Sequence, residues 1–100
     1  MIQARIGLVF GVRFFVVGEP KEAEVKLRFV TRYPLPGLRN PMTRIDKLRD
    51  EQTGPAKIGW ADFRGYSFDY DWEIVPGVWT FEVWDGDRKL VEQQLTVVKP

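Results

Sequence analysis

Two segments near the start of the chain have hydrophobic patterns typical of β-strands. Residues 8–17 (LVFGVRFFVV) are rich in β-branched and aromatic residues and end at a Gly/Pro-containing stretch. Residues 23–30 (AEVKLRFV) alternate strictly, with Ala23, Val25, Leu27 and Phe29 on one face and Glu24, Lys26, Arg28 and Val30 on the other. A period of two indicates a strand with one buried face, so both segments are predicted to be strands.

The clearest pattern lies in the last third, where two alternating runs surround an Asp-Gly pair. Residues 78–84 and 89–98 are predicted strands, and residues 85–87 form the reversal between them. That loop places Phe81 opposite Val91 and Trp79 opposite Gln93. The inward face then holds Trp79, Phe81, Val83, Val91, Leu95 and Val97, and the outward face holds Val78, Thr80, Glu82 and Trp84. The same alternation places polar Gln93 on the inward face, where an apolar residue is expected, and a β-bulge would turn it outward.

The pattern between residues 33 and 65 is less regular. Residues 33–41 (YPLPGLRNP) carry three prolines and a glycine, which predicts a loop. Residues 42–51 (MTRIDKLRDE) are predicted to form an edge strand, and a helix over 42–50 is the alternative because Ile45 and Leu48 have helical spacing. A turn is expected at residues 53–55, followed by a short stretch that ends at Gly65.

Residues 66–74 (YSFDYDWEI) alternate apolar side chains with Ser67, Asp69, Asp71 and Glu73. In a strand, the carboxylates of Asp69, Asp71 and Glu73 project from one face, with neighbours about 6.5–7 Å apart. A calcium ion needs six to eight oxygen ligands, usually from a loop that curls around it, and a straight strand does not provide them. The favoured interpretation is a solvated sheet face, with the acids paired to Lys26 and Arg28 on a neighbouring strand of the same sheet.

Length and net charge limit the number of domains and the kinds of molecule that the protein is expected to bind. One hundred residues predict a single domain spanning 1–100. Fifteen basic against fourteen acidic residues give a net charge of +1, so nucleic acid and anionic membranes are not expected partners. The apolar run at residues 6–17 contains Arg13, lacks a cleavage signal and is too short to span a membrane. Because cysteine is absent, the compartment stays open.

The residue types available leave little catalytic chemistry. Without cysteine or histidine there are no disulfides, thiol nucleophiles, zinc sites of the usual kinds or His-dependent triads. Ser67 is the sole serine. No catalytic residue, metal site or cofactor is therefore predicted, and the protein is expected to be non-enzymatic.

Four tryptophans supply the candidate binding residues. Trp72 and Trp79 belong to the predicted core, whereas the alternation does not assign Trp60 and Trp84 inward. Exposed tryptophans stack on sugar rings or anchor protein partners, although packing at the sandwich edge is the structural alternative. The predicted binding residues are Trp60, Trp84, Glu82 and Asp85.

Two quoted segments carry a family resemblance. GYSFDYDWEIVPGVWTFEVWDGDRKLVEQQLTV, together with GLVFGVRFFVVGEP and its Gly-x-x-Phe-Gly core at residues 7–11, resembles the bacterial family catalogued as domain of unknown function 3859 (DUF3859). The resemblance implies a small bacterial β domain without an assigned activity, so it supplies no catalytic residues. It also implies one more segment ahead of the Gly-x-x-Phe-Gly region. Since this chain starts close to that region, an uncovered strand edge that pairs with another chain is expected.

These observations predict an all-β fold, an immunoglobulin-like antiparallel β-sandwich of about seven strands. The predicted function is a non-enzymatic protein-interaction or structural module. It would use a sheet edge, with a homodimer as one outcome, or the surface of Trp60 and Trp84. Carbohydrate binding through Trp84 and Trp60 is the alternative, and a calcium-dependent variant comes third. The sequence does not identify the protein partner.

Overall fold

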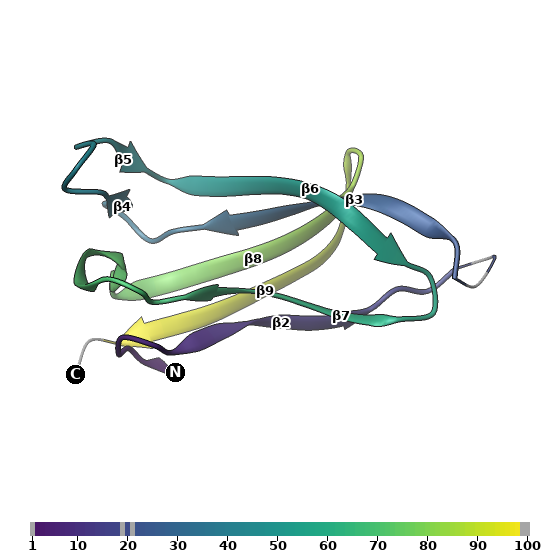
Figure 1. The fold of residues 1–100 in the computed structure, drawn as a ribbon, viewed down its shortest axis with the longest axis horizontal. Helices are drawn as coiled ribbons and strands as arrows, with labels where there is room; N and C mark the ends of the chain where they lie inside the picture. The colour runs from purple at the N-terminus through teal and green to yellow at the C-terminus, as the bar shows by residue number, and fades with distance from the viewer. Residues whose placement is uncertain (1, 19, 21, 99–100) are drawn as a thin grey trace.

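The computed structural model describes residues 2–18, 20 and 22–98, which form two facing β-sheets and a short extra strand pair (Figure 1). The larger sheet has the order β1-β9-β8-β3-β6, the smaller sheet consists of β2 and β7, and β4 pairs with β5. The strands are β1 (Ile2–Gln3), β2 (Val9–Phe15), β3 (Glu24–Arg32), β4 (Leu38–Arg39), β5 (Asp46–Lys47), β6 (Arg49–Lys57), β7 (Ala61–Ser67), β8 (Gly77–Asp85) and β9 (Arg88–Val98). The described residues include one helix, the three-residue 3₁₀ helix η1 (Asp71–Glu73), and no helix long enough to cross a membrane.

The two sheets pack face to face, as the strand pattern predicts for a sandwich. The larger sheet is antiparallel except at β1, which runs parallel to the end of β9. The smaller sheet lies along the inner face of the larger one (Figure 1). Phe10 of β2 contacts Trp79 and Phe81 of β8, with ring centroids 5.2 and 5.6 Å apart. The core therefore sits between the β2–β7 pair and the middle strands of the larger sheet.

Trp79 is the centre of this core. Its side chain is fully buried, and its Nε1–H donates a hydrogen bond to the Val75 carbonyl at 2.9 Å. Four aromatic rings surround it with centroids 5.0–5.5 Å away: Phe10, Tyr33, Tyr66 and Phe68. Most of these contacts are edge-to-face, an arrangement in which two aromatic rings gain more stability than the burial of their surface alone provides.

A second, smaller cluster lies toward the β6–β7 turn. It consists of Leu27, Phe29, Ala56 and Val83. Phe14 of β2 packs against it, with its ring centroid 6.1 Å from that of Phe29. This end of the core therefore joins residues of β3, β6 and β8 to a side chain of β2.

Four predicted strands are confirmed. Residues 8–17 contain β2, residues 23–30 lie in β3 together with the preceding turn residue Ala23, and the last two runs form β8 and β9. Trp79, Phe81 and Val83 face the core as predicted. Val30 differs from prediction. It points to the outer face of the larger sheet but is only 2% exposed, because charged side chains of the neighbouring strands cover it.

The hairpin has the predicted faces but different partners. The turn is two residues long, with Asp85 opposite Arg88, and Gly86 has the positive φ of 58° that such a turn uses at its first position. A bulge follows between Val83 and Trp84. Beyond it, Phe81 pairs with Gln93 and Trp79 with Leu95, two residues from the predicted partners. A shift of two preserves the faces, and Gln93 keeps its inward parity yet is exposed.

The strand predicted over residues 66–74 is wrong beyond Ser67, where β7 ends. The buried side chain of Glu73 explains the change. Its Oε1 accepts hydrogen bonds from the backbone N–H groups of Asp69 (2.8 Å) and Tyr70 (2.9 Å), which folds the segment into a turn leading into η1. A carboxylate that binds nearby backbone N–H groups competes directly with a sheet ladder.

The predictions for residues 42–65 are confirmed in part. Of the edge strand predicted over residues 42–51, β5 and the start of the edge strand β6 are formed, and the alternative helix over 42–50 is not. The turn expected at residues 53–55 is instead the middle of β6, which pairs with β3 throughout. Pro55 is tolerated there because β6 is an edge strand, where one side of the backbone needs no ladder hydrogen bonds.

Candidate interaction site

The predicted binding residues lie on different surfaces. Trp60 follows the β6–β7 turn, is 53% exposed and lies under the Lys57 ammonium, 5.5 Å from the ring centroid. It lines a hollow of about 260 Å³ that Pro55 and Asp62 also border. Trp84 lies on β8 and is not among the residues that line this hollow. The structure therefore does not bring Trp60 and Trp84 into one recess.

Trp84 occupies the outer face of the larger sheet between two cations. Its strand neighbours are Arg28 on β3 and Lys89 on β9, whose charged groups lie 5.0 and 5.6 Å from the ring centroid. Its Nε1–H donates to Glu82 Oε1 at 3.0 Å. Asp85 ends β8 opposite Arg88, in an exposed position at the hairpin turn. Carbohydrate binding by these residues stays a prediction.

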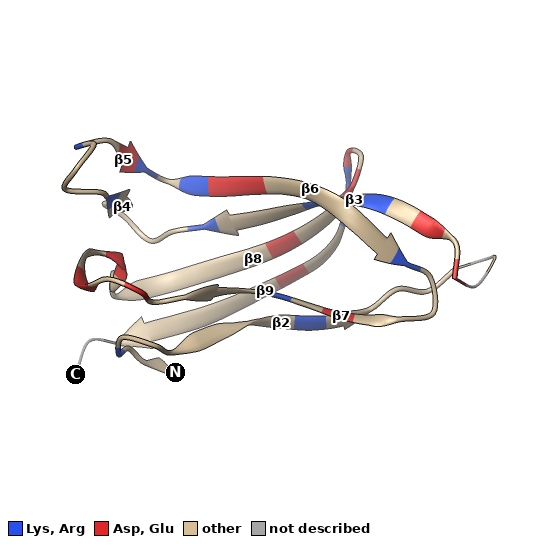
Figure 2. Cartoon of the chain, viewed as in Figure 1, with Lys and Arg blue, Asp and Glu red and all other residues tan. Residues whose placement is uncertain are grey.

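Glu82 is a buried carboxylate on this outer face that binds neighbouring side chains of the sheet. It is 5% exposed and contacts Arg32 Nε at 3.2 Å and Lys89 Nζ at 3.9 Å. Burial raises the pKa of Glu82, but the hydrogen bonds from Trp84 and Arg32 and the nearby cations outweigh it and hold the pKa below its usual value. Figure 2 shows acidic segments on β6, β8 and β9, with basic segments on β3 and β6 beside them.

Replacing Glu82 with glutamine is expected to lower the free energy of unfolding by about 1 kcal/mol at pH 7, because Arg32 loses its buried anionic partner. The folded pKa lies below the unfolded value of about 4.3, so this stabilisation is present above pH 4.3 and is lost as the pH falls through the folded pKa. Urea unfolding should show the difference shrinking as the pH falls below about 4.3. The exposed Glu92→Gln variant is the control, and an equal loss for Glu82→Gln at both pH extremes would contradict the expectation.

The predicted pairing of the acidic row with Lys26 and Arg28 is wrong. Both cations lie on β3 in the larger sheet, whereas Asp69 follows β7 of the smaller sheet. Arg28 instead pairs with Glu51 at 3.4 Å. A charge-paired sheet face does exist, but it lies on the larger sheet. Within the described ranges, no group of three or more Asp or Glu side chains is placed to hold a metal ion.

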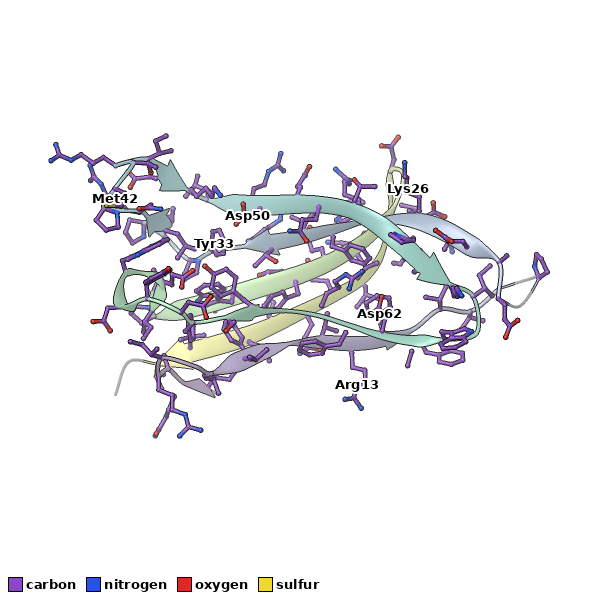
Figure 3. The ribbon with its side chains drawn as sticks, viewed as in Figure 1. Arg13, Lys26, Tyr33, Met42, Asp50 and Asp62 are labelled. Atoms are coloured by element: carbon purple, nitrogen blue, oxygen red, sulfur yellow. The ribbon has the colours of Figure 1, made fainter. Side chains whose placement is uncertain are left out.

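A groove results because the larger sheet extends one strand beyond the smaller one. In the described part of the chain, β6 pairs only with β3 and β7 only with β2, so each has an unpaired edge. Between them lie two adjoining hollows of about 380 Å³ each, both lined by Lys47, Asp50 and Tyr66. We call this the inter-sheet groove, defined by Tyr33, Lys47, Asp50, Gln52, Arg64, Tyr66, Trp72 and Glu73. Figure 3 shows Asp50 on β6 and Asp62 on β7, the two strands whose unpaired edges border the groove.

Two tyrosine–carboxylate hydrogen bonds organise the floor of the groove. The Tyr33 hydroxyl donates a hydrogen bond to Asp50 Oδ2, and the Tyr66 hydroxyl donates one to Glu73 Oε2. Lys47 Nζ lies 2.9 Å from the other oxygen of Asp50. Burial, followed by the hydrogen bond to the carboxylate, raises the pKa of both tyrosines well above the ordinary value. Both hydroxyls therefore stay protonated at neutral pH.

Arg64 places a cation over the apolar part of the groove. It belongs to the inward face of β7, and its guanidinium lies 4.2 Å from the ring centroid of Phe29. Asp62 lies two residues earlier on the same face and forms an ion pair with Arg64, with 3.4 Å between Asp62 Oδ2 and Arg64 Nη2. Polar side chains thus occupy inward positions of β6 and β7, where a fully covered sandwich would have apolar ones.

The sequence reasoning did not identify this groove. Of the predicted binding residues, Trp60 comes nearest, since its hollow contains residues of both β6 and β7. One usable signal was present: Asp50 and Gln52 share the inward parity of β6, and Asp62 and Arg64 that of β7. Polar residues at inward positions indicate a face that the chain itself does not cover.

A solved structure of similar fold supports the architecture. The crystal structure of an immunoglobulin-like protein from Pseudomonas aeruginosa matches 97% of this chain and 76% of its own, with a TM-score of 0.77 and 25% sequence identity. No family model matches the chain, and no curated protein matches it. The resemblance to DUF3859 therefore stays a prediction.

The strand order and this likeness define the class of protein. The chain is an immunoglobulin-like antiparallel β-sandwich, which confirms the predicted fold class. A fold of this kind hosts many unrelated functions, so the function has to be argued from the surfaces described above.

Proposed function

We propose that this domain is a non-enzymatic protein-interaction module that receives an extended segment of a partner protein in the inter-sheet groove. One observation carries the proposal: β6 pairs only with β3 in the described part of the chain, and the edge of β7 that borders the groove is unpaired. An extended peptide added to that edge makes backbone hydrogen bonds to β7 and covers the inner face of β6. Strand addition of this kind is a common mode of peptide recognition.

The lining of the groove supports a peptide as the ligand. Tyr33, Tyr66 and Phe29 supply aromatic surface, while Gln52 and Arg64 supply side-chain hydrogen-bond donors that suit peptide carbonyl groups. The ionisable groups of the groove are engaged with one another: Tyr33 donates a hydrogen bond to Asp50, Tyr66 donates one to Glu73, and Lys47 is paired with Asp50. These properties favour binding over catalysis.

The proposal is tested with phage-displayed random peptides longer than the seven residues of β7, selected on the immobilised domain. Selected peptides are then synthesised with a fluorescent label and titrated by anisotropy. Filling the groove with Gln52→Phe is expected to weaken their binding by at least about tenfold, because a ring at this inward position occupies the space of the added strand.

Thr53→Phe is the matched control. Thr53 is the next residue of β6, exposed on the opposite face, and its substitution should leave peptide binding unchanged. Failure to select any peptide, or equal affinities for wild type and Gln52→Phe, would contradict the proposal. Amide hydrogen exchange supplies a second reading, since bound peptide should slow exchange in β7.

A further inference from the structure

The outer edge of β2 is the second unpaired edge of the smaller sheet. Val9–Phe15 pair with β7 on one side, and no described strand pairs with the other side. We propose that this edge binds β2 of a second copy of the chain in an antiparallel arrangement. The two β2–β7 sheets then join into one four-stranded sheet across a two-fold axis.

β2 is less protected than the free edges of β6 and β7. The edge of β6 carries Pro55 and four charged residues, which are features that discourage strand addition by another sheet edge. β7 carries Asp62 and Arg64 and borders the groove. β2 has no proline and a single charge, Arg13, in a sequence of high β-propensity.

The parity of the side chains restricts the register. A two-fold axis perpendicular to the sheet keeps inward residues opposite inward residues only if one residue of β2 pairs with its own copy, and the axis then passes midway between these two copies. An axis at Val12, the middle residue of β2, pairs all seven residues of the strand. An axis at Arg13 would place two arginines opposite each other, and an axis at Gly11 would leave Phe15 beyond the paired strands.

The Val12-centred register also matches the side chains that β2 exposes. Arg13 points away from the larger sheet (Figure 3) and lies opposite Gly11 of the second copy, which has no side chain to obstruct it. Phe15, 60% exposed, lies opposite Val9 of the second copy, which is 58% exposed in the isolated chain. Two such apolar pairs form, one on each side of the axis, and they cover surface that is otherwise in water.

The test uses charges at this predicted pair. The solution mass is measured by light scattering from about 1 μM to about 1 mM, and the wild type should approach twice the 11.7 kDa of one chain. Val9→Lys combined with Phe15→Lys places like charges opposite each other twice and should raise the dimer dissociation constant about a hundredfold. Val9→Lys combined with Phe15→Glu places opposite charges there and should restore the dimer.

Val78→Lys is the control for a charge at an exposed apolar position elsewhere, on the outer face of β8, and should leave the mass unchanged. Thermal unfolding of each variant verifies that the fold is retained. A wild type that stays monomeric throughout, a dimer that survives the two lysines, or a dimer that the Lys–Glu combination does not restore would overturn the inference. The groove beside β7 stays open in this dimer, so peptide binding there and self-association succeed or fail independently.

Discussion

Replacing Gly11 or Gly65 with alanine is expected to lower the free energy of unfolding by about 3 kcal/mol or more. The two glycines lie opposite each other in β2 and β7. A Cβ at Gly11 would overlap the Arg64 carbonyl oxygen and the Gly65 Cα, and a Cβ at Gly65 would overlap the Phe10 carbonyl oxygen. These atoms belong to the backbone, so relief requires the two strands to separate.

The consequence reaches the whole sandwich, because β2 and β7 form the entire smaller sheet among the described residues. At about 4–8 °C per kcal/mol for a domain of this size, the melting temperature should fall by about 12–24 °C. Gly54→Ala is the matched control. Gly54 also lies in a strand, but a Cβ there would meet the Phe29 ring at 3.6 Å, an ordinary contact, so stability should stay level or rise slightly. Equal melting temperatures for the Gly11 and Gly54 variants would contradict the steric argument.

Replacing Trp79 with alanine is expected to cost about 3–5 kcal/mol, a large part of the stability of a domain this size. The fully buried indole fills the space between the two sheets and contacts rings from β2, from β7 and from the segments that follow β3 and β7. Its removal leaves a cavity that none of these rings can fill without losing its own contacts. The urea midpoint measures the loss.

Two variants separate packing from polarity. Trp79→Phe keeps most of the apolar volume but removes the N–H that binds the Val75 carbonyl, and it should cost about 1–3 kcal/mol. Trp60→Ala removes an exposed indole and should change stability by less than about 1 kcal/mol. A loss for Trp60→Ala as large as that for Trp79→Ala would show that the core is not centred where the structure places it.

Local pattern was sufficient for much of the fold. The alternation over residues 23–30 and the runs around the Asp-Gly pair predicted β3, β8 and β9 with most of their buried faces. The same kind of pattern failed over residues 66–74. There a single contact, the Glu73 carboxylate on the N–H groups of Asp69 and Tyr70, replaced the strand with a turn. Alternation does not reveal such a contact, because both structures fit the same sequence of polar and apolar residues.

The alternation of polar and apolar residues did not locate the candidate groove. Tyr33 and Asp50 are 17 residues apart, and Arg64 meets the ring of Phe29 from a different sheet. Their proximity depends on β6 lying at the far edge of the larger sheet while β7 crosses to the smaller one. The pairing partners in the final hairpin were missed because the two-residue turn and the bulge next to Trp84 each shift the later pairs by one residue.

The sequence by itself determined that the fold is all-β, that cysteine and histidine chemistry is absent, and which side of most strands is buried. Those properties depend on composition and on neighbours one or two residues away. Only the tertiary structure decided that β6 and β7 border a groove with edges that no described strand pairs, that β2 has an exposed apolar edge, and that Glu82 is buried among cations. These features depend on how distant strands are ordered in the sheets, which short-range alternation does not encode.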